Sequence, residues 1–168
     1  FQALLLRYLF PEEKQVSIVP VLCTSLPQVQ SGEPPEANAE AEEFLGALRT
    51  VLAERGGEAC LIAGADLSHV GRRFGQDLSL SPPLLRELEL QDRSMIQRIL
   101  DRDAAGFFRG IQEERDRRNV CGVPAIYALL RLLPRSSSRL LAYGQAPDPQ
   151  SQSVVTFMAA AFYEGRTM

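Results

Sequence analysis

The predicted fold depends most on Ala59-Cys60-Leu61-Ile62-Ala63-Gly64, which runs into Ala65-Asp66-Leu67-Ser68-His69. Its short apolar run, bounded by glycines, predicts a buried β-strand over 59–64. Apolar residues at helical spacing predict a helix over 37–54, and the Gly56-Gly57 pair is typical of a helix end. An apolar, β-branched run over 16–23 predicts an earlier strand, although Pro20 disfavours a central place in a sheet. Strand, helix and strand in this order predict a parallel βαβ unit.

The remaining segments complete the pattern of a single α/β domain over 1–168. Its predicted sheet holds parallel and antiparallel strands flanked by helices, and the last two strands are expected to be antiparallel neighbours. Proline at a first helical position and aspartate as an N-cap predict two of the helix starts, and a dense charge run predicts a solvated helix end. The expected elements are helices over 1–10, 82–90, 92–100, 103–117 and 125–133, strands over 138–144 and 153–163, loops over 24–35 and 145–152, and the charged helix end over 113–118.

Composition limits the classes of function. The net charge of −3 offers no attraction for nucleic acid or for an anionic membrane, so neither is an expected partner. Three cysteines without regular spacing argue against a disulfide framework and predict a cytoplasmic protein. Cys23 and Cys60 lie in strand-like runs and are expected to be buried. The chain opens with Phe1 in an apparent helix, which suggests the C-terminal portion of a longer protein.

His69 is the only histidine in the chain, and it stands three residues after Asp66. Ligands in α/β sheets bind beyond the carboxyl ends of strands, which is where this pair is predicted to lie. Asp66 could orient the imidazole, so that His69 acts as a general acid or base. Alternatively, Asp66 caps the loop through backbone N–H groups and His69 packs on it. The spacing alone favours the structural alternative.

Cys121 differs from the other cysteines because it precedes Gly122 and Pro124 at the start of an apolar helix. Helix N-termini stabilise thiolates, so Cys121 could be a nucleophile or a metal ligand, with an inert buried thiol as the simpler alternative. One histidine and one suitable cysteine do not by themselves complete a metal site, which usually needs three protein ligands.

Four segments occur in an order and at a spacing that resemble one known family. They are Phe1–Phe10 leading into Val19-Pro20-Val21-Leu22, then Gly64-Ala65-Asp66-Leu67-Ser68-His69-Val70-Gly71-Arg72-Arg73-Phe74, then Val120-Cys121-Gly122-Val123-Pro124-Ala125-Ile126, and finally Leu141–Gln145 with Ser153–Phe162. Together they resemble the Memo family, whose bacterial and archaeal branch is called AmmeMemoRadiSam system protein B. The second segment is similar to the family's "SSDLSHYG..F" motif and the third to its "CGxxPI" motif. The resemblance covers the whole chain.

The resemblance implies an α/β fold shared with class III extradiol dioxygenases, which use non-haem iron. It implies that Cys121 is a metal ligand and that Asp66 and His69 line the same cleft as candidate catalytic residues, with no further cofactor-binding residue. The family's two N-terminal histidines do not occur in this chain, so the resemblance implies an incomplete metal site here, with iron or copper in the full-length protein. Val70 stands where the family usually has an aromatic residue, so the wall of the cleft is expected to be less able to stack against a ring.

Three hypotheses follow. The first is a metal-dependent redox protein acting beside radical-SAM and AmmeCR1-type proteins, which are the partners that the family name implies. The second is a non-catalytic scaffold that binds peptides or proteins in the same cleft. The third is a domain that folds but has no activity of its own.

Overall fold

The fold is described from a computed structural model, which describes residues 2–10, 16–24, 28–133 and 136–164. Its sheet is built on a long hairpin of β2 (Ser136–Asp148) and β3 (Ser153–Glu164), with the short β1 (His69–Gly71) on the other edge of β3. Both pairings are antiparallel. The prediction of two antiparallel C-terminal strands is therefore confirmed, and the hairpin reaches further into the expected loop than the sequence suggested.

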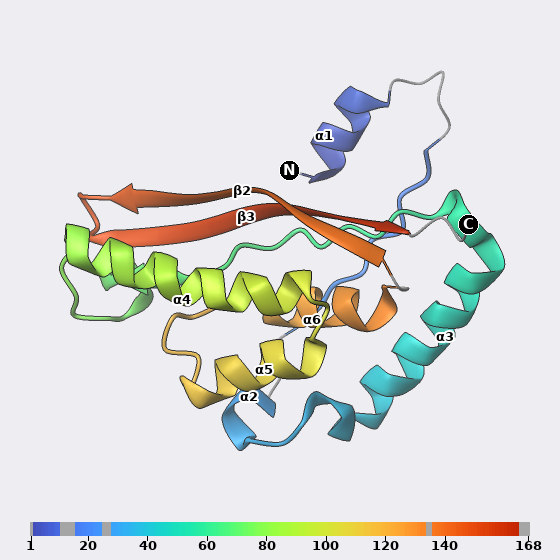
Figure 1. Ribbon diagram of the computed structural model, residues 1–168, viewed down its shortest axis with the longest axis horizontal. Helices are drawn as coiled ribbons and strands as arrows, with labels where there is room; N and C mark the ends of the chain where they lie inside the picture. Colours follow the sequence, from blue (N-terminus) through green and yellow to red (C-terminus); the bar gives the residue numbers. More distant parts are fainter. Residues whose placement is uncertain (1, 11–15, 25–27, 134–135, 165–168) are drawn as a thin grey trace.

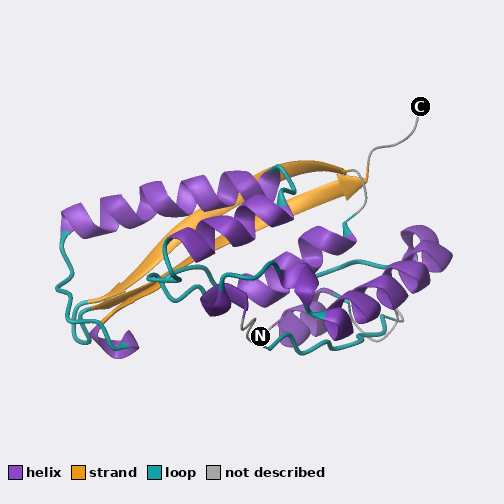
Figure 2. Ribbon diagram, turned by 90° about the horizontal axis from the view of Figure 1, so that it is seen from below, coloured by secondary structure: helices purple, strands orange, loops and turns teal. Residues whose placement is uncertain are grey.

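The helices α4 (Pro82–Leu100), α5 (Ala104–Glu113) and α6 (Val123–Leu132) lie on one side of this hairpin (Figure 1). Figure 2 shows the long axis of α4 running beside the strands. Strand side chains alternate in the manner of a sheet covered on one face: Met158 and Phe162 pack against the core, whereas Phe157 is 44% exposed. The α/β class is confirmed. The core is formed by Leu67, Met95, Ile96, Ile99, Phe107, Phe108, Ile111, Val120, Val123, Ile126, Tyr127 and Leu130.

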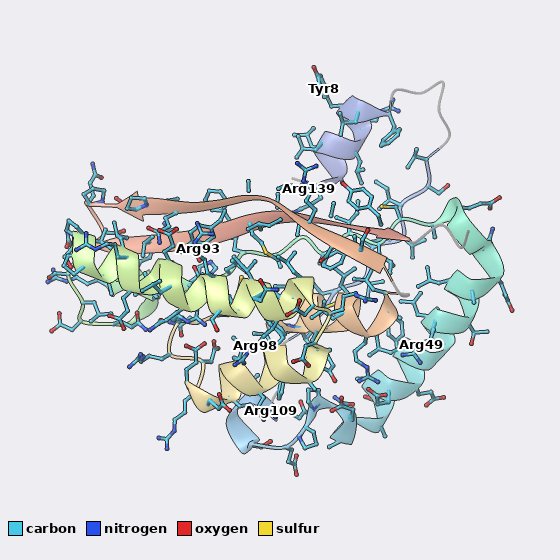
Figure 3. The ribbon with its side chains drawn as sticks, in the orientation of Figure 1. Tyr8, Arg49, Arg93, Arg98, Arg109 and Arg139 are labelled. Carbon is cyan, nitrogen blue, oxygen red and sulfur yellow. The ribbon has the colours of Figure 1, made fainter. Side chains whose placement is uncertain are left out.

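The remaining helices lie towards the N-terminus of the chain. They are α1 (Gln2–Leu9), α2 (Gln28–Ser31) and α3 (Ala39–Arg55), with short 3-10 turns η1 (Pro35–Ala37), η2 (Gly56–Glu58) and η3 (Arg72–Phe74). In Figure 3 the Tyr8 side chain points from α1 away from the rest of the molecule, in line with its 83% exposure. No helix in the described ranges is long and apolar enough to cross a membrane.

Several predicted helix boundaries are confirmed by their capping contacts. Ser81 caps α4 ahead of Pro82, and its hydroxyl accepts a hydrogen bond from the backbone N–H of Leu84. The Asp103 carboxylate accepts from Gly106 N at 2.8 Å at the start of α5. Gly56 ends α3 with φ of 55°, a backbone conformation that side chains disfavour.

The parallel βαβ unit is wrong for the described part of the chain. Residues 16–24 form no strand there and are exposed, and residues 59–66 lie outside any strand. Pairing to β3 begins later, where Leu67 N donates to Thr156 O at 2.9 Å. A strand forms only where a neighbour satisfies its N–H and C=O groups, which an apolar run cannot specify. For the same reason Cys23 and Cys60, predicted to be buried, are exposed.

Two further predictions are wrong because a buried ion pair was not foreseen. The two helices expected over 82–90 and 92–100 form one helix, α4, and Asp92 is 0% exposed within it. The run over 113–118 was expected to be a solvated helix end, but α5 ends at Glu113 and Arg118 is only 6% exposed. The expected loop over 24–35 contains the short helix α2, and residues 25–27 lie outside the described residues.

Candidate metal centre

Asp66, His69 and Cys121 come together at the start of β1, which begins at His69, and not beyond the carboxyl end of a strand as predicted. Their ligand atoms all lie within 4.8 Å of one another. His69 Nε2 lies 3.8 Å from Asp66 Oδ2, which is too far for a hydrogen bond and close enough for an electrostatic contact. The residues that the sequence singled out as a possible site are therefore neighbours in space.

The backbone around His69 is held on both sides. His69 pairs with Val155 of β3, and its N–H donates to Arg118 O at 2.7 Å. The Asn119 side-chain amide donates to His69 O at 3.1 Å. These bonds tie the segment that leads to Cys121 alongside the DLSH motif, although the two are about fifty residues apart in the chain.

The imidazole itself is oriented by a backbone carbonyl. His69 Nδ1 lies 3.3 Å from Leu67 O, and the Phe74 ring meets the imidazole edge-on at a centroid distance of 5.0 Å. A carbonyl oxygen only accepts hydrogen bonds, so this contact favours the tautomer with the proton on Nδ1. In that tautomer Nε2 keeps its lone pair free on the side of Asp66. The orienting group for the imidazole is thus the Leu67 carbonyl rather than the Asp66 carboxylate that the sequence suggested.

Val70, expected to weaken the wall of the cleft, is buried instead. It is 3% exposed and packs with Leu88 and Val154 in a small second core cluster. The aromatic ring beside the histidine is that of Phe74, four positions further along, and not a residue at position 70.

Gly122 sets the distance between the thiol and the carboxylate. A Cβ at this position would collide with the backbone oxygen of Asp66 and would lie 2.8 Å from Ala65 Cβ. The φ of −75° is ordinary for any residue, so the requirement for glycine is close approach and not backbone conformation. The absence of a side chain at position 122 lets Cys121 lie against the DLSH segment.

The environment of Cys121 favours a protonated thiol. The residue is exposed as a whole, but neighbouring atoms partly withdraw its sulfur from water, and this desolvation raises the pKa of the Cys121 thiol. The charges of Asp66 and Asp116 act in the same direction, while a hydrogen bond from the Asp66 backbone opposes them. Cysteine nucleophiles are activated by a lowered pKa, so this surrounding suits a metal ligand, whose proton a cation displaces, better than a nucleophile.

Three residues that support the site were missed by sequence reasoning. Ser68 and Asp92 are 0% exposed and Arg118 is 6% exposed, and they form one hydrogen-bonded cluster behind His69. A signal for Asp92 was present in the sequence. Asp92 lies on the same helical face as the apolar residues Leu88, Met95 and Ile99. A carboxylate on such a face is buried, so it needs a buried partner for its charge.

The comparisons with known proteins agree with the sequence motifs. The family model described as "Memo-like protein" matches residues 1–161. The chain belongs to the Memo-like protein family. It is 25% identical over 166 residues to a protein described as "MEMO1 family protein" from Aquifex aeolicus (strain VF5). That alignment covers 97% of this chain and 39% of the Memo-like relative, so the chain spans well under half of that relative's length.

Proposed function

We propose that this Memo-like chain holds a redox-active transition metal, iron or copper, through Asp66, His69 and Cys121. The observation that carries the proposal is the convergence of three different donor side chains within 4.8 Å, from two segments far apart in the sequence. Three protein ligands are the number typical of a metal site that keeps a position open for substrate.

The donor set fits such an ion. A thiolate and an imidazole suit iron and copper, and a carboxylate adds charge and hardness. The Leu67 carbonyl beside Nδ1 is the kind of outer contact that fixes a metal-binding histidine. The three residues differ from the ligand set that the family resemblance implied, because Asp66 and His69 become ligands alongside Cys121. Bound iron or copper would supply one-electron chemistry.

The cellular setting is also a proposal. The DLSH and CG motifs resemble those of AmmeMemoRadiSam system protein B, which supports action beside radical-SAM and AmmeCR1-type proteins. Three free cysteines support a cytoplasmic location.

Metal analysis of the purified protein tests the proposal. We expect about one iron or copper ion per chain after anaerobic loading and desalting. Asp66→Asn, His69→Ala and Cys121→Ser should each weaken binding by more than the roughly 10–100-fold typical of outer contacts. Cys60→Ser is the matched control, because Cys60 is an exposed free cysteine outside the site. Wild-type protein that takes up neither metal, or a Cys60→Ser loss equal to that of Cys121→Ser, would refute the proposal.

A second candidate function is protein binding without chemistry. Its support is the exposure of large apolar side chains on the N-terminal extended segment, where Val19 is 84% and Leu22 is 90% exposed. Exposed apolar patches of this kind mark interaction surfaces. The metal analysis separates the two candidates, since a scaffold needs no ion and is indifferent to Cys121→Ser.

A further inference from the structure

A buried charged cluster adjoins His69 through the neighbouring Ser68. Arg118 donates through Nη1 to Asp92 Oδ1 at 2.5 Å and to Ser68 Oγ at 3.1 Å. The same guanidinium donates to both carboxylate oxygens of Glu114, from Nε at 2.8 Å and from Nη2 at 2.6 Å. Ser68 Oγ completes a triangle by donating to Asp92 Oδ1 at 2.6 Å. The guanidinium is thereby fixed in one orientation by three partners.

The second carboxylate oxygen of Asp92 also accepts a hydrogen bond. Tyr143 of β2 donates its hydroxyl to Asp92 Oδ2 at 2.9 Å, and Gln145 donates to the Tyr143 oxygen at 3.0 Å. Both oxygens of the Asp92 carboxylate are therefore hydrogen-bonded, Oδ1 to Arg118 and Ser68 and Oδ2 to Tyr143 of the sheet. Its position cannot shift without breaking several bonds together.

Ser68 connects this cluster to the candidate site. It stands between the two residues that set the imidazole, because Leu67 supplies the carbonyl at Nδ1 and His69 carries the ring. Its backbone is held by Thr156, whose Oγ1 accepts from Ser68 N and whose N–H donates to Ser68 O, both at 2.9 Å. Arg118 reaches the same stretch twice, through its guanidinium on Ser68 and its carbonyl on the N–H of His69.

The cost of burying this cluster points to a role beyond packing. Well-packed apolar residues in place of a buried ion pair are commonly as stabilising as the pair itself. What apolar residues cannot do is hold a backbone at one position through directed bonds. Here the Arg118 guanidinium donates to Ser68 and to Asp92, which itself accepts from Ser68. Its remaining partner is Glu114, four residues earlier in the chain.

We propose that Arg118 is the positioning residue of the candidate metal centre. Through Ser68 and its own carbonyl, it holds His69 with the Nδ1 proton on Leu67 O and with Nε2 on the side of Asp66. This inference rests on the proposed function for its consequence, the affinity for metal. The orientation of the imidazole is measurable without any metal.

The single histidine makes the orientation directly observable. Protein labelled with ¹⁵N-histidine gives one pair of ring nitrogen signals, whose shifts in the neutral ring identify the tautomer. We expect the Nδ1-protonated form to dominate in the wild type and to give way to a mixture in Arg118→Met and Ser68→Ala. Ser68→Ala keeps the Arg118–Asp92 ion pair, so it tests the link if Arg118→Met does not fold. Arg118→Lys, which keeps the charge but not the two-point geometry, should restore the wild-type form only in part.

Cobalt titration of the same proteins provides the second measurement, since thiolate-to-cobalt absorption reports binding at Cys121. We expect Arg118→Met and Ser68→Ala to weaken binding by about 10–100-fold, the usual effect of losing an outer contact. Arg109→Met, a change to an exposed arginine on α5, is the control and should change neither readout (Figure 3).

The outcomes separate the two proposals. A changed tautomer in the variants, with neither iron, copper nor cobalt bound even by the wild type, would support the positioning role and overturn the metal-binding function. Folded Arg118→Met and Ser68→Ala proteins that keep the wild-type tautomer would overturn the positioning role, even if their metal affinity fell together with their global stability.

Discussion

Replacing Gly122 by alanine tests whether close backbone approach builds the candidate site. The added methyl group would lie 2.8 Å from Ala65 Cβ and 3.0 Å from Ile126 Cδ1, and it would overlap the Asp66 carbonyl oxygen. Ordinary contact begins near 3.4 Å, so the segments must separate by at least about 0.6 Å. The Asp66 contact involves backbone, which cannot swing aside as a flexible side chain would.

The expected loss of stability is that of overpacking a tight contact, about 1–3 kcal/mol. It would appear as a lower midpoint of urea unfolding, with an unchanged dependence on urea concentration. The same displacement exceeds the roughly 0.2 Å tolerance of metal–ligand distances, so the affinity for iron or copper should fall by at least about tenfold.

Gly46→Ala is the matched control. Gly46 lies in α3, and a Cβ there meets nothing within 4 Å. Because alanine favours helix, we expect this variant to match the wild type or to gain up to about 1 kcal/mol. If Gly122→Ala proved as stable as Gly46→Ala, the argument from close approach would be refuted.

Three other predictions concern the stability of the fold. Arg118→Met should cost about 3–5 kcal/mol in urea unfolding by leaving Asp92 buried without its partner, and adding Asp92→Leu should recover part of this loss; no recovery would contradict the ion-pair explanation. Burial and the hydrogen bond to Glu36 raise the pKa of Tyr127 to about 12. The protonated hydroxyl therefore contributes stability that is complete below about pH 10 and is lost as the pH rises to about 12. Tyr127→Phe should abolish that component of alkaline unfolding, and an unchanged pH dependence would count against it. Asn38→Ala should cost about 0.5–2 kcal/mol by removing the cap of α3, whereas Asn38→Asp should be nearly neutral.

The candidate site was predictable in its members and not in its geometry. Asp66 and His69 were identified from their place in the chain and Cys121 from its position before a helix, and the family motifs joined them. The bond from His69 N to Arg118 O, which draws these segments together, has no sequence signature because backbone groups are alike at every position. The same limit explains why the orienting carbonyl of Leu67 was missed.

Local physical chemistry in the sequence determined the helices and the C-terminal hairpin. Caps such as Asp103 and Ser81, the helical period of apolar residues, and the polar stretch between the two C-terminal apolar runs act between near neighbours, so they are readable without a fold. Which apolar runs became strands, and which charges became buried, depended instead on contacts between distant segments. Residues 16–24 stay unpaired in the described chain, while Arg118 leaves its charged run to meet Asp92. Strand pairing and charge burial both depend on partners that are distant in the sequence, and the residues of one segment do not specify which distant segment will pair with it.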